Sequence, residues 1–157
     1  MIRIDIPATS ANLGSGFDSL GIALTMCNRV WMEEADELKI TTTDKIKVPT
    51  DETNLIYWAA RHLYQICGKT LPGLHIIQEN NIPMARGLGS SSACIVAGIL
   101  GANRMLGSPM SQSDLINLAA QIEGHPDNTS PAISGGLVAS AMEGKRVYSV
   151  SVPVSGK

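Results

Sequence analysis

The sequence predicts an α+β domain, in which helices pack on one face of a mixed sheet. Two observations support this fold class. Alternating apolar and polar residues, typical of strands, lie near both ends of the chain, whereas apolar residues at helical spacing fill its middle. A further strand, expected at residues 73–80, separates two of the helices, so strands and helices are interleaved. The 157 residues fit one domain.

Three strands are expected in the first third of the chain. Residues 2–6 alternate apolar and polar side chains, and residues 22–32 and 38–42 contain the β-branched types that strands favour. The polar, glycine-rich residues 7–21 should form a turn between the first two strands. The charged residues 33–37 should connect the second strand to the third.

The first helix is expected over residues 54–67, with Thr53 or Asn54 as its N-cap and Gly68 as the residue that ends it. Apolar side chains recur along this segment at the spacing of one helix face, which should be buried. The residues of this expected apolar stripe are Leu55, Ala59, Leu63 and Ile66.

Two further helices are expected after the strand at residues 73–80. Residues 90–106 are mostly small or apolar, as a buried helix requires, and Gly107 should end the helix. Ser111 followed by Asp114 is typical of a capping box, which predicts another helix over residues 112–123.

The remaining residues are expected to form a hairpin that completes the sheet. Residues 124–131 are polar and should form a loop or a short helix. Residues 137–142 and 146–152 have strand character, and residues 143–145 between them are suited to a tight turn.

Residues 83–93 are the segment most informative about function, because they combine a flexible loop with a helix start. Gly87 and Gly89 permit positive φ and let a ligand approach the backbone, and the serines that follow offer N-cap hydroxyls. The first N–H groups of a helix lack partners inside the helix and favour a phosphate. Without other motifs, an ordinary capped helix after a glycine turn is the alternative. The residues of the predicted nucleotide site are Pro83, Arg86, Gly87, Leu88, Gly89, Ser90, Ser91, Ser92 and Ala93.

The composition argues against several classes of partner. The formal net charge is -2 and no dense run of Lys or Arg occurs, so nucleic acid is not expected as the main partner. No apolar run approaches the roughly 20 residues of a membrane span, and residues 1–6 are typical of a strand, not of a targeting sequence. The three cysteines form no CxxC pair and no metal-binding spacing, which favours reduced thiols in a cytoplasmic protein.

Three segments of the chain, in order, resemble the GHMP superfamily of small-molecule kinases, and within it the homoserine kinase branch. The segments are residues 7–21, the loop at 83–93, and residues 122–136 with their Glu-Gly-His-Pro-Asp-Asn sequence. Thr9 and Ser10 stand where the mevalonate and galactose kinase branches usually have a lysine or arginine. The resemblance implies a fold like domain 2 of ribosomal protein S5. It also implies that residues 1–157 are the N-terminal ATP-binding domain of such a kinase, without its C-terminal domain.

The resemblance further implies a reaction and a substrate site. The γ-phosphate of ATP would pass to the hydroxyl of L-homoserine, giving O-phospho-L-homoserine in threonine biosynthesis. Asn12, Asp18 and His125 are implied to bind the amino acid, since a carboxylate suits its ammonium group and an amide suits its hydroxyl. Taken by themselves, Asn12 and Asp18 are also explained as residues that stabilise a glycine-rich turn.

His125, Asp127 and Asn128 form a dense polar cluster after a helix end, and the resemblance implies that they are the catalytic residues. Asp127 matches the catalytic base of mevalonate-type kinases. In homoserine kinases, orientation and charge stabilisation are thought to suffice without an obligatory base, as the loose transition state of phosphoryl transfer allows.

Mg²⁺ is the metal that the resemblance implies, with a loop hydroxyl and a helix carboxylate as its protein ligands. Ser91 matches the hydroxyl. Relatives often have Glu-x-Glu-Gly before the histidine, whereas this chain has Gln121-Ile122-Glu123-Gly124. Glu123 is therefore the expected carboxylate ligand, and a hydrated metal held mainly by ATP is the alternative.

Two other functions stay open. The chain could belong to another GHMP kinase with a different small alcohol as acceptor. By itself it could also be a non-catalytic module that binds a nucleotide or another anion. Small-molecule substrates are the expected partners, and the sequence leaves the oligomeric state open, a homodimer included.

Overall fold

The chain forms six strands and four helices in the computed structural model, which describes residues 1–16 and 18–153. The strands are β1 (Ile2–Ala11), β2 (Leu20–Glu34), β3 (Lys39–Thr42), β4 (Leu74–Glu79), β5 (Leu137–Glu143) and β6 (Arg146–Val152). The helices are α1 (Leu55–Ile66), α2 (Ser90–Met105), α3 (Gln112–Glu123) and α4 (Thr129–Ser134). The α+β class predicted from the sequence is confirmed.

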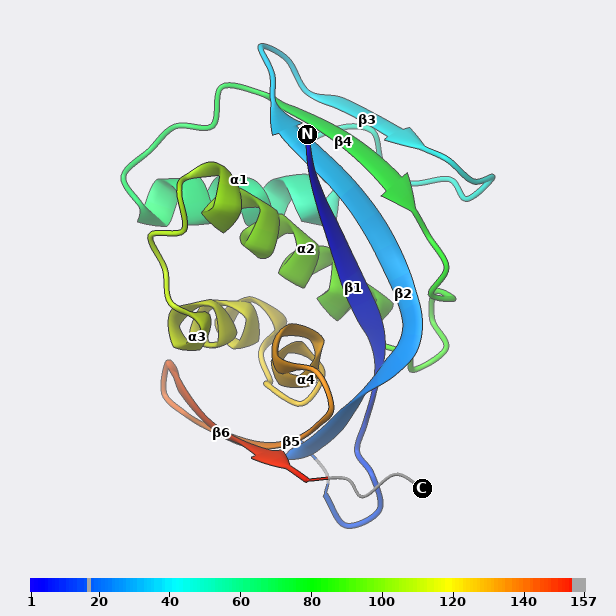
Figure 1. The fold of residues 1–157 in the computed structure, drawn as a ribbon, viewed down its shortest axis with the longest axis vertical. Helices are drawn as coiled ribbons and strands as arrows, with labels where there is room; N and C mark the ends of the chain where they lie inside the picture. Colours follow the sequence, from blue (N-terminus) through cyan, green and yellow to red (C-terminus); the bar gives the residue numbers. More distant parts are fainter. Residues whose placement is uncertain (17, 154–157) are drawn as a thin grey trace.

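The long strand β2 connects two parts of one sheet. β1 pairs antiparallel with most of β2, whereas β4 pairs with residues 29–34 and β5 with residues 20–22. β3 joins β4 in parallel and β6 joins β5 antiparallel, so the order is β3-β4-β2-β5-β6 with β1 also beside β2. The sheet is mixed, as expected, and β2 curves through both of its parts (Figure 1).

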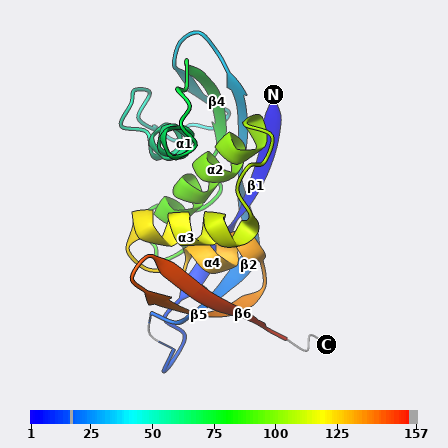
Figure 2. The same cartoon turned by 90° about the vertical axis from the view of Figure 1, so that its left-hand side faces the viewer.

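The helices lie on one face of this sheet. Figure 2 shows α1, α2 and α3 stacked on the same side, and α4 contacts α3, β1, β2 and β5. The core between the layers is aliphatic, with Ile6, Met32, Leu63, Ile76 and Val96 almost fully buried. This arrangement places the start of α2 and the turn between α3 and α4 against the end of β1.

The buried face of α1 differs from the expected stripe. Ala59 and Leu63 are fully buried, but Leu55 and Ile66 are 40% and 52% exposed. The side chains that share the buried face with Ala59 and Leu63 are those of Ile56, Tyr57, Ala60 and Tyr64. Both sets have helical spacing, so periodicity could not distinguish them. Packing selected the set that buries two tyrosine rings.

The turn expected at residues 7–21 is shorter than predicted. Residues 7–11 continue β1 and pair with β2 beyond a bulge between Pro7 and Thr9. Ala8 and Thr9 are both buried although they are neighbours, which breaks the alternation of a regular strand. The sequence predicted an end at residue 6 because residues 7–21 are polar and rich in glycine, whereas the alternation of burial continues to Ala8.

Local signals at the helix ends are confirmed. Asn54 caps α1, and Ser111 and Asp114 form a capping box at α3. Gly68 and Gly107 have φ of 69° and 80°, the left-handed geometry that ends a helix. The polar residues after α3 include the short helix α4.

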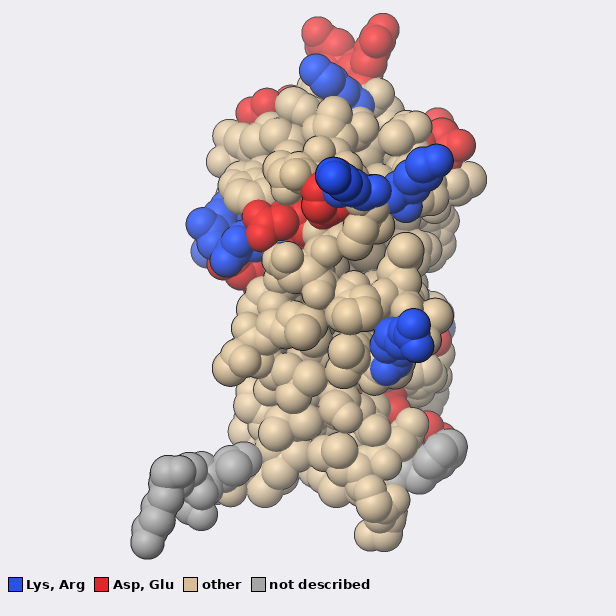
Figure 3. All heavy atoms as spheres, turned by 90° about the vertical axis from the view of Figure 1, so that its right-hand side faces the viewer, with Lys and Arg blue, Asp and Glu red and all other residues tan. Residues whose placement is uncertain are grey.

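The surface mixes charges of both signs. On the face in Figure 3, basic and acidic side chains neighbour one another in the upper half, and the lower half is largely uncharged. Among the residues that the structure describes, no helix is both long enough and apolar enough to cross a membrane.

Candidate active site

The loop at residues 83–89 leads from β4 to the first turn of α2. Gly89 is the N-cap of α2, with φ of 66°, and no side chain of the described chain caps this helix. The expectation that a serine hydroxyl caps it is therefore wrong, because the N-cap position is one residue earlier. Ser91 is exposed and Ser92 is buried. The first N–H groups of α2 and the Ser91 hydroxyl thus remain available to an anion.

Three segments that are distant in sequence meet at Gly89. The Thr9 amide donates to the carbonyl of Leu88 at 3.1 Å, and the Thr9 hydroxyl donates to Oδ1 of Asn128 at 2.8 Å. A Cβ on Gly89 would lie 2.2 Å from Thr9 Oγ1 and 3.2 Å from Asn128 Oδ1. The fold therefore assembles the three sequence motifs into one site.

The polar cluster after α3 contains a buried carboxylate in contact with an imidazole. Asp127 is 1% exposed, and its Oδ1 is hydrogen-bonded to Nδ1 of His125 and accepts from the Asn128 amide at 3.1 Å. The His125 side chain is 44% exposed. A carboxylate in this position orients the ring, so the other ring nitrogen can act on a ligand or exchange a proton.

Gly21, at the start of β2, lies directly against this cluster. A Cβ there would be 1.8 Å from the Asp127 carbonyl oxygen and 2.9 Å from Pro131. Gly21 belongs to the first motif, residues 7–21, but no role for it could be predicted from the sequence. A glycine inside a strand was the signal, since it often marks a close approach of another backbone.

Asn12 and Asp18 face each other across the loop between β1 and β2. Oδ1 of Asn12 accepts from the Asp18 amide at 2.9 Å, and the two residues have φ of 59° and 56°. This contact is the turn-stabilising role that the sequence allowed. The Asp18 side chain is exposed, so its carboxylate is open to a ligand. Residue 17 of this motif lies outside the described residues.

Ser91 and Glu123 line the same cavity, of about 420 Å³. A hydroxyl and a carboxylate are oxygen donors of the kind that Mg²⁺ prefers, with water and phosphate oxygens completing its shell. Gln121 instead donates to the carbonyl of Lys145 at 3.0 Å, toward the β5–β6 turn. No cluster of three or more His, Cys, Asp or Glu side chains suited to a metal occurs in the described residues.

Cys94 lies one turn into α2, close to Glu123. Burial raises the pKa of the Cys94 thiol to about 11, and the charge of Glu123 adds to the effect. The thiol is therefore neutral near pH 7. It fits the packing role that its place on a buried helix indicates, not that of a nucleophile.

A mostly apolar cavity of about 300 Å³ opens beside Ser90 and Ser91. One wall is the segment 46–49 after β3, and another includes Ile82 and Met84. These walls were not predicted, because segment 46–49 has no motif.

Two buried amides form the polar end of this cavity. Asn54 accepts from the Ile56 amide at 3.0 Å as the cap of α1, so its Nδ2 is the donor to the Pro49 carbonyl at 2.9 Å and to Gln78 Oε1 at 3.0 Å. The Gln78 oxygen is thereby occupied, and its NH₂ group is the part left for a ligand. A glutamine on the buried face of β4 was the available sequence signal.

The chain is similar to proteins of one known family. Residues 54–136 match the GHMP kinases N terminal domain. A homoserine kinase of Clostridium botulinum (strain 657 / Type Ba4) is 45% identical over 157 residues, covering 99% of this chain and 52% of that protein. A homoserine kinase of Trichodesmium erythraeum is 49% identical over 150 residues, covering 91% and 49%.

A solved structure is also similar along the chain. The crystal structure of homoserine kinase from Cytophaga hutchinsonii has a TM-score of 0.84 at 31% identity, covering 98% of this chain and 52% of that one. The chain spans about half the length of the curated relatives it matches. On the family match, which includes α1, the loop at residues 83–89 and the His125–Asn128 turn, the chain belongs to the GHMP kinases, as their N-terminal domain.

Proposed function

We propose that the chain is the N-terminal, ATP-binding part of a homoserine kinase, which transfers the γ-phosphate of ATP to the hydroxyl of L-homoserine. The meeting of Thr9, Gly89 and Asn128 is the observation that supports this most, because it joins the anion-binding loop to both polar motifs. Relatives at 45% and 49% identity are named homoserine kinase, which supports the choice of acceptor.

In this proposal the triphosphate of ATP binds residues 87–93 and its base enters the apolar cavity. The free N–H groups of α2 and the exposed Ser91 hydroxyl suit the phosphates. The cavity of about 300 Å³ offers apolar walls for a purine and the Gln78 amide as a donor to a ring nitrogen. Ser91 and Glu123 would hold Mg²⁺, which would supply positive charge against the triphosphate.

On the acceptor side, Asp18 binds the ammonium group of homoserine, and Asn12 holds Asp18 in place through its amide. His125 and Asn128 orient the hydroxyl toward the γ-phosphate. Asp127 is buried and already hydrogen-bonded to His125, which supports a role in positioning that ring more than direct proton removal. The hydroxyl oxygen bonds to phosphorus as the bond to ADP breaks, and its proton passes to the His125 ring or to the transferred phosphate.

Compartment and assembly belong to the same proposal. The three cysteines are free thiols, which fits a reducing compartment, so we place the protein in the cytoplasm. A homodimer remains a prediction that sedimentation would test.

The experiment is a phosphotransfer assay on a two-part protein, in which this chain is followed by the C-terminal half of a GHMP kinase. L-homoserine, mevalonate and galactose are offered separately with Mg-ATP. Homoserine should be phosphorylated with a kcat/KM at least about 100-fold above the other two, since only homoserine offers an ammonium group to the Asp18 carboxylate. Equal turnover of mevalonate would indicate another GHMP kinase, and ATP binding without any turnover would indicate a binding module.

The role of Asp127 is tested in the same assay with Asp127→Asn. An asparagine keeps the oxygen that contacts His125, so kcat should fall by less than about 100-fold if Asp127 is a positioning residue. A larger loss, with the homoserine KM unchanged, would instead identify Asp127 as the general base.

A further inference from the structure

We infer that Asn28 and Asp44 are positioning residues for the nucleotide, because together they hold the segment that leads from β4 into the loop at residues 83–89. This inference rests on the proposed ATP-binding function. Neither residue belongs to the three motifs, and neither lies in the loop itself.

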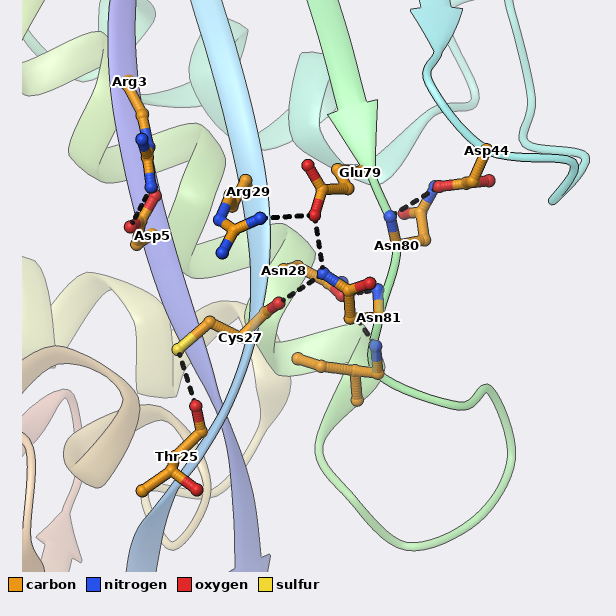
Figure 4. A network of polar contacts seen from close by, with 11 residues as sticks. Arg3, Asp5, Thr25, Cys27, Asn28, Arg29, Asp44, Glu79, Asn80 and Asn81 are labelled. Carbon is orange, nitrogen blue, oxygen red and sulfur yellow. Dashed lines mark hydrogen bonds and ion pairs between the residues drawn. The ribbon is translucent and has the colours of Figure 1, made fainter.

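Three consecutive backbone N–H groups are held by oxygens of these two side chains. Asp44 Oδ2 accepts from the Asn80 amide at 2.6 Å. Asn28 Oδ1 accepts from the amides of Asn81 at 2.7 Å and Ile82 at 2.8 Å. Figure 4 shows Asn28 and Asp44 on either side of the chain, where β4 ends and the loop begins.

These contacts replace strand pairing at the point where it stops. The last pair between β2 and β4 joins Arg29 to Glu79, so the next N–H groups have no strand partner. Such groups need another acceptor when they are buried. Because the two acceptors come from β2 and from the turn after β3, they fix the exit direction of the chain from two sides.

Asp44 also holds the opposite wall of the apolar cavity. Its Oδ1 accepts from the Ile46 amide at 2.7 Å, while its Oδ2 also contacts Nδ2 of Asn80 at 3.2 Å. Ile46 belongs to one wall of the cavity, and Asn80 and Ile82 to the other. One carboxylate therefore sets the separation of the two walls between which the base would bind.

The side chain of Asn81 strengthens this connection. Its Nδ2 donates to the Cys27 carbonyl at 3.0 Å and to Oε1 of Glu79 at 3.0 Å, and Glu79 pairs with Arg29 at 2.6 Å. These bonds link the same segment to β2. Of the residues whose side chains form these bonds, only Asn80 lines the cavity, so the network acts mainly through the backbone it holds.

The test compares ATP affinity in the wild-type chain and four variants. Asp44→Ala removes both wall contacts, and Asn28→Leu removes the acceptor for two amides at similar size. Asn28→Asp keeps an acceptor oxygen and should restore binding. Asp5→Ala is the matched control, since Asp5 is an exposed carboxylate of the same sheet that pairs with Arg3, away from the loop.

We expect Asp44→Ala and Asn28→Leu to raise the Kd for Mg-ATP about tenfold, because a segment that must be ordered on binding lowers affinity. Asn28→Asp and Asp5→Ala should stay within about twofold of wild type. Amide hydrogen exchange without nucleotide should quicken at residues 80–85 in the first two variants, and stay unchanged in β1. A purely structural role would instead raise exchange throughout the sheet.

Folded Asp44→Ala and Asn28→Leu proteins with wild-type ATP affinity would overturn the inference and leave the proposed function standing. If Asn28→Leu does not fold, Asp44→Ala still decides, because Asp44 is only partly buried. A wild-type chain that binds no Mg-ATP would overturn the proposed function, and this inference with it.

Discussion

At the residue scale, Gly89 is constrained by the protein as well as by any ligand. A Cβ on it would meet Thr9 Oγ1 at 2.2 Å, and its φ is 66°, whereas Gly87 has a φ of 68° with open space around it. Gly87→Ala should therefore cost about 1–2 kcal/mol in the free energy of unfolding, from the left-handed backbone alone. Gly89→Ala should cost about 1–3 kcal/mol more, because Thr9 and Asn128 must move.

Urea denaturation of both variants and of the wild type measures this difference. The Kd for Mg-ATP should rise further in Gly89→Ala than in Gly87→Ala, since only the former disturbs the contact with Asn128. Equal stability of the two variants would contradict the proximity of Thr9 to Gly89.

The thiol of Cys94 should make the chain less stable in alkali. Its pKa is raised from 9.0 to about 11, mainly by burial. Between these values the unfolded chain loses a proton that the folded chain keeps, so the free energy of unfolding falls by up to about 1.4 kcal/mol per pH unit. The stability that the protonated Cys94 thiol contributes is fully present below pH 9 and is lost as the pH rises toward 11.

Urea titrations at pH 9 and pH 10 measure the slope, with Cys94→Ala as the comparison. The variant should show a flatter dependence in this range. Burial and the Glu34 carboxylate also raise the pKa of Tyr64 above its usual value near 10, so the measurement stops at pH 10. The same slope in both proteins would show that Cys94 is not buried as described.

At the element scale, the N-caps of α1 and α3 differ in the number of hydrogen bonds that they form outside their own helix. Ser111 forms only a local capping box, whereas Asn54 caps α1 and also donates to the Pro49 carbonyl and to Gln78. Ser111→Ala should cost about 1 kcal/mol in the free energy of unfolding. Asn54→Ala should cost about 2–4 kcal/mol, because the buried Pro49 and Gln78 acceptors lose their donor as well.

Thermal or urea unfolding of the two variants tests this ranking, and ATP titration tests its link to function. Asn54→Ala should weaken ATP binding in any protein that remains folded, because Asn54 and Gln78 line the apolar cavity. Ser111→Ala should leave it unchanged. If both caps affect ATP equally, the cavity is not the site of the base.

At the scale of the whole molecule, β2 and the turn before α4 are joined at Gly21. A Cβ there would be 1.8 Å from a backbone oxygen of Asp127, and a backbone atom cannot move aside as a flexible side chain can. Gly21→Ala should therefore cost about 3 kcal/mol or more in the free energy of unfolding. It should also lower phosphotransfer, since Asp127 would be displaced.

Ser10→Ala is the control for this prediction, because Ser10 lies on the adjacent strand β1, paired with Ile22. Its effect on stability should stay within about 0.5 kcal/mol. A Gly21→Ala protein as stable as this control would contradict the close packing of β2 against the Asp127 turn.

From the sequence we could predict the α+β class, the order of the elements, the capping box at Ser111 and the three motifs. These features depend on residues close together in the chain: periodicity, capping pairs and glycines at turns. The end of β1 and the buried face of α1 were predicted incorrectly. In the first case the polar, glycine-rich residues 7–21 indicated a turn although β1 continues to Ala11, and in the second two stripes have equal helical spacing.

How these parts come together depends on long-range contacts of the fold. The bond from Thr9 to Asn128 joins residues 119 positions apart, and that from Asn80 to Asp44 joins residues 36 apart. Local patterns contain no information about such pairs, because each partner is an ordinary polar residue in its own segment. The curved strand β2 brings these segments together. It pairs with β1 on one edge and with β4 and β5 on the other, so the loop at residues 83–89, the apolar cavity and the His125–Asn128 turn lie close to one another.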